Sequence, residues 1–313
     1  NLGQNEGGGL IKYSSPVQIP GTTWSPTLNK FDSGSYQECI AIKTDGTLWT
    51  WGTNEQGQLG QNQGPAQLGA ASSPVQVPGT TWNKCSAGGT VVGAIKTNGT
   101  LWMWGNNIRG VLGQNSDSTP GYATSSPVQV PGTTWSSIKI SRRTVFALKT
   151  DGTLWSWGYN QRGMGGDNSV VDKSSPTQVP GTTWSTLAHP NASHQLSGTA
   201  IRTDGTLWSW GYNVCGVLGQ NQAGTGVNYS SPVQIPGTTW TTVSNAYGFS
   251  GAVKSDGTLW TWGRNDRGNL AQNSVNTPAY AGISSPVQVP GTTWQQYSAG
   301  SHTNCQAGAI KKI

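Results

Sequence analysis

The 313-residue chain is short of the residues that usually fill a protein core. It has three Phe and two Met, and only 10% of its residues are charged. A chain with so little large apolar content is predicted to be disordered when its net charge is high, but here the formal net charge is only +6. Sixteen Trp supply the missing apolar area, because each buried indole removes about 150–250 Å² from water. The composition therefore predicts a folded chain with a core of Trp and small residues.

The chain also lacks the features of several protein classes. No apolar run approaches the ~18 residues that a membrane helix needs, and no basic-then-apolar leader is visible. No basic cluster exceeds the pairs Arg142-Arg143 and Lys311-Lys312, so a phosphate-binding stripe is absent. The 45 Gly and 17 Pro recur too closely for long helices. We expect no membrane insertion, no nucleic-acid partner and little helix.

What the chain does contain is a repeat. The phrase Pro-Gly-Thr-Thr-Trp occurs six times, about 54 residues apart. Its Trp residues are Trp24, Trp82, Trp135, Trp184, Trp240 and Trp294. A second phrase, Asp/Asn-Gly-Thr-Leu-Trp-x-Trp-Gly, occurs five times and supplies the other ten Trp. Every Trp is thus a repeat residue, and a repeat of this length indicates a modular architecture.

Each repeat has the pattern of four short strands. In the second copy they are Ser73–Val77, Trp82–Gly88, Val91–Lys96 and Thr100–Trp104. Asn98-Gly99 between the last two suits a tight hairpin turn, because Asn-Gly tolerates positive φ. Four strands per repeat predict an all-β propeller of six repeats with four-stranded blades, formed by one domain over residues 1–313. A solenoid is the competing repeat architecture.

The segment Ala41–Gly60, which reads AIKTDGTLWTWGTNEQGQLG, resembles the repeat of the regulator-of-chromosome-condensation (RCC1-type) β-propeller family. Family members usually have seven blades, so the alternative is a seven-bladed ring with part of the chain missing. The near-identical copies, rich in Asn, Gln, Thr and Ser, are similar to secreted bacterial and phage-encoded members. The resemblance implies a propeller that binds other molecules.

The two ends of the chain match complementary parts of a repeat. Leu2–Asn5 matches Leu59–Asn62, and Ala309–Lys311 matches Ala41–Lys43. We therefore expect the last blade to be shared between the ends, with Ser15–Ile19 as its outer strand. Its Trp-x-Trp strand would come from residues upstream of Asn1 or from another subunit, because an unpaired edge invites strand addition.

Few residues suit catalysis or metal binding. The three His are His189, His194 and His302, and no Cys or acidic residue stands at metal-ligand spacing near them. Only three Glu are present, and no nucleophile–base arrangement stands out. We expect no enzyme activity, no metal and no cofactor. Cys39, Cys85, Cys215 and Cys305 allow three full pairings; a Cys39–Cys305 closure disulfide and buried free thiols are both open.

Positions that differ between copies are the candidates for binding, since identical positions serve the scaffold. They fall in the loop after the Pro-Gly-Thr-Thr-Trp strand and in the loop after Trp-x-Trp-Gly. Tyr and Arg are over-used at binding hot spots. The candidates are Tyr36, Arg109, Arg142, Arg143, Tyr159, Arg162, His189, His194, Tyr212, Tyr247, Phe249, Arg264, Arg267 and His302. Neutral drift of surface loops is the alternative for most of them.

Three functions remain open. The favoured hypothesis is a non-catalytic binding or adhesion propeller, displayed extracellularly or on a virus particle as a fibre or receptor-binding structural protein. It would recognise a surface glycan or protein. The second is a guanine-nucleotide exchange and chromatin regulator of the RCC1 type, which the uniform repeat lengths disfavour because they leave no room for a wedge insertion. The third is a proteinaceous enzyme inhibitor.

Overall fold

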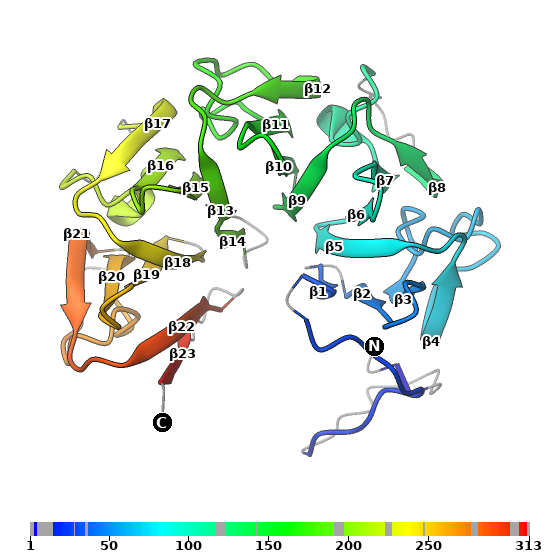
Figure 1. Cartoon of the computed structure of the whole chain (residues 1–313), viewed down its shortest axis with the longest axis horizontal. Helices are drawn as coiled ribbons and strands as arrows, with labels where there is room; N and C mark the ends of the chain where they lie inside the picture. The colour runs from blue at the N-terminus through cyan, green and yellow to red at the C-terminus, as the bar shows by residue number, and fades with distance from the viewer. Residues whose placement is uncertain are drawn as a thin grey trace.

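The computed structural model forms an open arc of β-sheets around a common centre (Figure 1). It describes residues 3–4, 15–27, 29–34, 37–116, 123–141, 143–190, 197–222, 227–246, 248–276, 281–300 and 307–311. Secondary structure in this part of the chain is almost entirely strand, with two 3₁₀ segments, η1 (Ile108–Gly110) and η2 (Val214–Gly216). The predicted all-β propeller with four-stranded blades is confirmed.

Five sheets each contain four consecutive antiparallel strands. The first is β1 (Phe31–Ser33), β2 (Cys39–Ile42), β3 (Leu48–Thr53) and β4 (Ala70–Val77). The second is β5 (Trp82–Gly88), β6 (Val91–Lys96), β7 (Leu101–Asn106) and β8 (Ala123–Gln129). The third is β9 (Trp135–Ile140), β10 (Thr144–Lys149), β11 (Leu154–Gly158) and β12 (Lys173–Gln178).

The fourth sheet is β13 (Trp184–Leu187), β15 (Ser197–Arg202), β16 (Leu207–Gly211) and β17 (Tyr229–Ile235). The fifth is β18 (Trp240–Asn245), β19 (Phe249–Lys254), β20 (Leu259–Arg264) and β21 (Gly282–Val289), with β14 (His189–Pro190) added in parallel to β18. The last comprises β22 (Trp294–Ala299) and β23 (Ala307–Lys311). The second to fifth sheets thus start at a Pro-Gly-Thr-Thr-Trp strand and take the following Ser-Pro strand as their outer edge, whereas the first sheet starts at Phe31 and the described part of the last sheet has two strands.

The core lies between neighbouring sheets. Ile138 and Ile140 of β9 pack with Met103 of β7 and with Trp157 of β11 in one buried cluster. The second Trp of each Trp-x-Trp pair is at most 1% exposed in every copy. In four of them the indole N–H donates to a loop carbonyl of the preceding sheet, as Trp157 Nε1 does to Val111 O at 2.8 Å. These Trp therefore join adjacent blades, as the sequence predicted.

The Gly that follows this Trp has a steric reason to be conserved among the copies. Gly158 has a φ of +95°, and a Cβ placed on it would lie 2.2 Å from Arg143 O. Positive φ and this close backbone approach both exclude other residues. Gly158 therefore allows the loop that joins β9 and β10 to pass directly over the end of β11.

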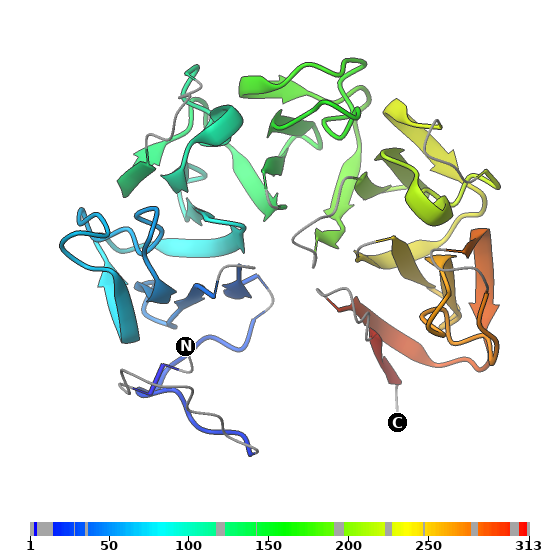
Figure 2. The same cartoon turned by 180° about the vertical axis from the view of Figure 1, so that it is seen from behind.

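The shared last blade is not formed. Residues 15–19 contain no strand, and among the described strands β23 pairs only with β22. Figures 1 and 2 show the N-terminal segment and β23 on opposite sides of the opening in the arc. Ser15–Ile19 therefore does not serve as the outer strand of the last sheet, which corrects that expectation. A strand supplied by another subunit or by upstream residues stays a prediction.

Candidate binding face

The two kinds of variable loop emerge at the same end of each sheet, because the four strands alternate in direction. We call this end the loop face. It carries the connections between first and second strands, such as Gly89–Thr90, and the loops after the third strand, such as Asn54–Gly69. The opposite end, the turn face, carries the Asp/Asn-Gly turns and the Pro-Gly-Thr-Thr segments. The candidate residues that the structure describes belong to the loop face or to the strand ends beside it.

A buried Asn organises each loop after the third strand. Asn160 Oδ1 accepts the Gly165 backbone N–H at 2.7 Å, while its Nδ2 donates to Asp167 Oδ1 at 2.8 Å. Asn54, Asn107, Asn213 and Asn265 accept the equivalent backbone N–H at 2.9–3.1 Å. These Asn are at most 6% exposed. The backbone of the loop is thus held constant while its outward side chains change from copy to copy.

Several candidates pair with one another across neighbouring sheets. The side chain that follows Trp-x-Trp-Gly in one sheet contacts a side chain from the loop after the third strand of the preceding sheet. Tyr159 lies under the Arg109 guanidinium at 5.9 Å, and Tyr212 lies under Arg162 at 4.3 Å. In the earlier copy Asn106 Nδ2 donates to Gln56 Oε1 at 3.0 Å instead. The Tyr and Arg candidates therefore contribute cation–π contacts between blades as well as surface.

Arg109 has a second partner on this face. Its Nη1 donates to Asp172 Oδ2 at 3.0 Å, and the Arg109 side chain is 39% exposed. Asp172 in turn accepts the backbone N–H of Asn160 at 2.7 Å. An exposed ion pair of this kind contributes little to stability, so its main effect is to hold Arg109 in place beside Tyr159.

Two candidates are not surface residues. Phe249, the first residue of β19, is 0% exposed in the core cluster between the last two sheets. Arg264 is 4% exposed, and its Nε and Nη2 donate to the two carboxylate oxygens of Asp266 at 2.6 and 2.7 Å. A buried guanidinium already paired with a carboxylate is not available to a ligand. Both assignments to a binding surface are therefore corrected.

The remaining candidates divide by how far the structure describes them. Arg267 is exposed on the loop after β20. His189 is the first residue of β14, where its backbone pairs with Ser244. Tyr36, Arg142, His194, Tyr247 and His302 lie outside the described residues, as does Cys305.

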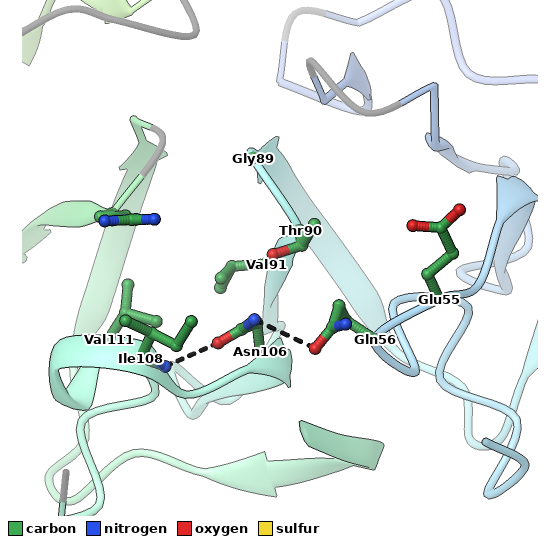
Figure 3. A pocket seen from close by; sticks show the side chains of 9 residues that line it. Glu55, Gln56, Gly89, Thr90, Val91, Asn106, Ile108 and Val111 are labelled. Atoms are coloured by element: carbon green, nitrogen blue, oxygen red, sulfur yellow. Dashed lines mark hydrogen bonds between the residues drawn. The ribbon is translucent and has the colours of Figure 1, made fainter. Parts of the chain in front are cut away.

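The loop face contains a pocket of about 170 Å³ formed by three consecutive sheets. Glu55 and Gln56 come from the first sheet, and Arg143 comes from the third. Residues of the second sheet lie between them: Gly89, Thr90, Val91, Asn106, Ile108 and Val111. Figure 3 shows Asn106 bonded to both Gln56 and the Ile108 backbone, with Val91 and Val111 beside them. The pocket therefore combines an apolar base with amide groups at its side.

Opposite charges flank this pocket. Because the second sheet lies between the first and the third, the Glu55 carboxylate and the Arg143 guanidinium reach it from different sides. Neither side chain forms an ion pair with another residue in the part of the chain that the structure describes. The pocket can thus pair with a cationic and an anionic group of one ligand at the same time.

Sequence reasoning found Arg143 but missed the other pocket residues. Glu55 is one of three Glu in the chain, and the equivalent loop position in the next copies holds Ile108, Gln161, Val214 and Asp266. A comparison of the copies at this single position identifies Glu55 as one of two acidic residues among five copies. Nothing in the sequence places it near Arg143, because 88 positions separate the two along the chain (143 minus 55).

The turn face is uniform by contrast. In six copies a Lys or Arg lies over Trp rings at 4.1–5.0 Å, and in five of them it contacts two rings. Lys149 illustrates the arrangement, 4.8 Å from Trp135 and 4.3 Å from Trp155. These cations cover the aromatic faces that a sugar or base would need for stacking. The turn face therefore keeps the same cation–aromatic packing from copy to copy.

Reactive groups are scarce in the described residues. Burial raises the pKa of the Cys39 thiol to about 11 and also raises the pKa of Cys85, so both thiols are protonated at neutral pH. Cys39 is a free thiol in the structure, and Cys305, its partner in the closure disulfide considered above, lies outside the described residues. The described residues contain no cluster of three or more His, Cys, Asp or Glu suited to a metal. No helix among them has the length and apolarity to cross a membrane.

Comparison with known proteins agrees with this geometry. Residues 45–95 and 256–305 match the regulator of chromosome condensation (RCC1) repeat. It is 24% identical over 272 residues to the ultraviolet-B receptor UVR8 of Arabidopsis thaliana, covering 84% of this chain and 59% of UVR8. It is 26% identical over 249 residues to the human E3 ubiquitin-protein ligase HERC2, covering 77% of this chain and 5% of HERC2.

Solved structures share the fold. The yeast RCC1 (Prp20) complex with Kap60 superposes with a TM-score of 0.72 at 19% identity, covering 90% of this chain and 67% of that one. Human WBSCR16 gives a TM-score of 0.71 at 18% identity, covering 86% of this chain and 71% of that one. At such identities the likeness establishes an RCC1-like propeller fold, and function must be argued from the site.

Proposed function

We propose that this protein is a non-catalytic binding propeller that recognises a protein or glycan on a surface through its loop face. We further propose that it is displayed extracellularly or on a virus particle, as an adhesin or fibre component. The turn face and the contacts between sheets form the scaffold. The loop face supplies recognition, with the pocket of Glu55, Gln56, Asn106 and Arg143 at its centre.

The pocket on the loop face supports binding most strongly. It is built from three sheets and has two charged groups of opposite sign without a described partner. A charged side chain gains from a complementary partner, and complementary charges fix the orientation of a bound surface. Because the Asn residues hold the loops rigidly, little ordering cost is added on binding.

The relatives favour a protein as the partner. Yeast RCC1 is solved in complex with Kap60, and Prp20p of Saccharomyces cerevisiae is described by its binding properties to Gsp1p and histones. A glycan would normally stack on exposed aromatic faces, and the turn-face Trp rings are covered by Lys or Arg. The composition supports display outside the cell, since it is rich in uncharged polar residues with 10% charged residues overall.

The experiment is a binding screen with matched variants. The purified chain is applied to arrays of cell-surface proteins and of glycans, in parallel with the double variant Glu55→Gln/Arg143→Gln. The control is Asp151→Asn on the turn face, which reproduces the Asn98 found in the second copy. We expect hits for the native chain and the control that lose at least tenfold in affinity in the double variant. No hit on either array, or equal binding by all three proteins, would contradict the proposal.

A further inference from the structure

A second cavity lies where the first strands of the sheets meet at the middle of the arc. Its volume is about 250 Å³, far above the ~10–15 Å³ that one buried water requires. Two Lys and several hydroxyl groups line it, among them Lys84 of β5, Lys139 and Ser137 of β9, and Thr186 of β13. It is separate from the loop-face pocket, with which it shares no lining residue.

Both Lys form a hydrogen bond at the cavity, but they differ in burial. Lys139 is 7% exposed, and its Nζ donates to Asn29 Oδ1 at 2.8 Å. Lys84 is partly buried, and its Nζ donates to the Ser136 carbonyl. Burial lowers the pKa of both. Each ammonium has three N–H donors, so neutral partners leave donors of both groups for a further acceptor.

Negative charge near these Lys is limited. Asp32 raises the pKa of Lys139, but its carboxylate also accepts Ser86 Oγ at 3.0 Å and the Ala87 N–H at 3.2 Å. The second Lys neighbours the first, and Lys84 lowers the pKa of Lys139. Lys84 forms no ion pair with a described residue. The Asp32 carboxylate thus acts on Lys139, whereas burial alone acts on Lys84, so an anion placed between the two Lys would gain a charge-assisted hydrogen bond from Lys84.

The repeat supplies an internal control for these positions. The strand register places Ser137, Thr186, Thr242 and Gln296 at the position of Lys84. It places Ser86, Ser244 and Ser298 at the position of Lys139. In the first sheet both positions are charged: Asp32 pairs with Ile40 at the position of Lys139, and the Ile42 N–H donates to the Lys30 carbonyl at the position of Lys84. Small or uncharged polar residues satisfy the fold in the sheets that follow β12. Lys84 and Lys139 lie in adjacent sheets, and both line one cavity.

We propose that this cavity is a binding site for a small oxyanion, a phosphate or carboxylate group held between Lys84 and Lys139. The hydroxyls of Ser137 and Thr186, which line the cavity and make no hydrogen bond with a described residue, donate to the same anion. Ammonium groups bind such anions as point charges through charge-assisted hydrogen bonds. The site does not depend on the function proposed for the loop face.

The test uses inorganic phosphate and citrate as probes on the full chain. Calorimetric titration and thermal unfolding are measured at constant ionic strength, balanced with sodium chloride. The variants are Lys84→Ser, Lys139→Ser and the double change, which place the residues of other copies at these positions. Lys173→Ser on outer strand β12 is the charge-matched control for a single change.

We expect at least one probe at 10 mM to raise the unfolding midpoint of the native chain and of Lys173→Ser by about 2 °C or more. Each single Lys84 or Lys139 variant should lose most of this shift, and the double variant all of it. Phosphate alone would assign a phosphate-type ligand, and citrate alone a carboxylate-type ligand. No shift with either probe, or equal shifts in native chain and double variant, would overturn the site. If the double variant does not fold, Lys84→Ser alone decides, since Lys139 keeps its bond to Asn29.

Discussion

The loop face and the turn face are built from the same repeats, yet they differ in what is kept from copy to copy. On the turn face a cation lies over Trp rings at 4.1–5.0 Å in six copies. On the loop face the matching cross-blade pairs change from Gln56–Asn106 to Arg162–Tyr212. The difference teaches that the scaffold is stabilised on one face and between the sheets, which leaves the side chains of the other face free to vary.

The largest effect should come from removing a Trp between sheets. Trp157→Ala deletes a side chain that is 1% exposed and donates to Val111 O. We expect a loss of about 3–5 kcal/mol in the free energy of unfolding, because the cavity cannot collapse between two sheets. Urea unfolding followed by Trp fluorescence measures it. A loss under about 1 kcal/mol would mean that the sheets do not pack as described.

The next effect concerns the Asn that organises a loop. Asn160→Ala leaves the Gly165 N–H and neighbouring carbonyls unpaired in a buried site. We expect about 1–3 kcal/mol of destabilisation, measured by the same unfolding experiment. The adjacent exposed change Gln161→Ala serves as its control and should stay within about 0.5 kcal/mol. Equal results for both variants would show that the loop backbone is not held by Asn160.

A smaller effect is expected on the turn face. Lys149→Gln removes the cation over Trp135 and Trp155, which should cost about 1 kcal/mol. Lys149→Arg is the control, because Arg202 occupies the equivalent position in the fourth copy, and it should preserve stability. If Gln and Arg behave alike, the cation–π contact contributes nothing measurable.

The stability that the hairpin turns contribute should depend on pH in the four copies that have Asp and not in the copy that has Asn98. Hydrogen bonds from the Thr two residues on lower the pKa of Asp45, Asp151, Asp204 and Asp256. A folded pKa below the unfolded value near ~3.9 gives stability that is present above that value and is lost as pH falls through the folded pKa. Asn98 makes the same bonds to Thr100 without a charge.

Replacing the four Asp by Asn should therefore flatten the fall in stability between pH 4 and pH 2 while changing little at pH 7. Denaturant unfolding at both ends of this range measures the difference. The change Asn98→Asp should steepen the same acid limb. An unchanged pH profile in both directions would show that these hydrogen bonds do not favour the charged form.

The smallest effect on stability should come from the pocket itself. Glu55→Gln/Arg143→Gln removes two charges that have no described partner, so we expect a change within about 0.5 kcal/mol. A larger loss would mean that the pocket belongs to the scaffold, and the contrast between the two faces would then fail.

Much of the fold was predictable because local chemistry repeats. Asn98-Gly99 and its equivalents fix the hairpin turns, and the Trp spacing fixes which strand faces the next sheet. Long-range packing decided what was missed. Phe249 reads as a loop residue after Tyr247 and Gly248, but the neighbouring sheet buries it. Arg264 carried a visible signal, the Asp two residues further on, that indicates a local ion pair.

Other features of the structure could not be predicted from the sequence of one repeat. The second Thr of Pro-Gly-Thr-Thr has positive φ in all six copies, 67° at Thr183 for example, although β-branched residues rarely adopt that region. The pocket arises only when three sheets are placed side by side, so Glu55 and Arg143 could not be joined from sequence. The central cavity with Lys84 and Lys139 depends on the same arrangement.

Hydrogen exchange on a complex tests the division between the faces most directly. With any partner found in the array screen bound, backbone exchange is mapped by mass spectrometry over the native chain. The account predicts slowed exchange in loop-face peptides that cover residues 88–92, 105–112 and 143–146, with no change in turn-face peptides that cover 96–100 and 149–153. Protection confined to the turn-face peptides would contradict it.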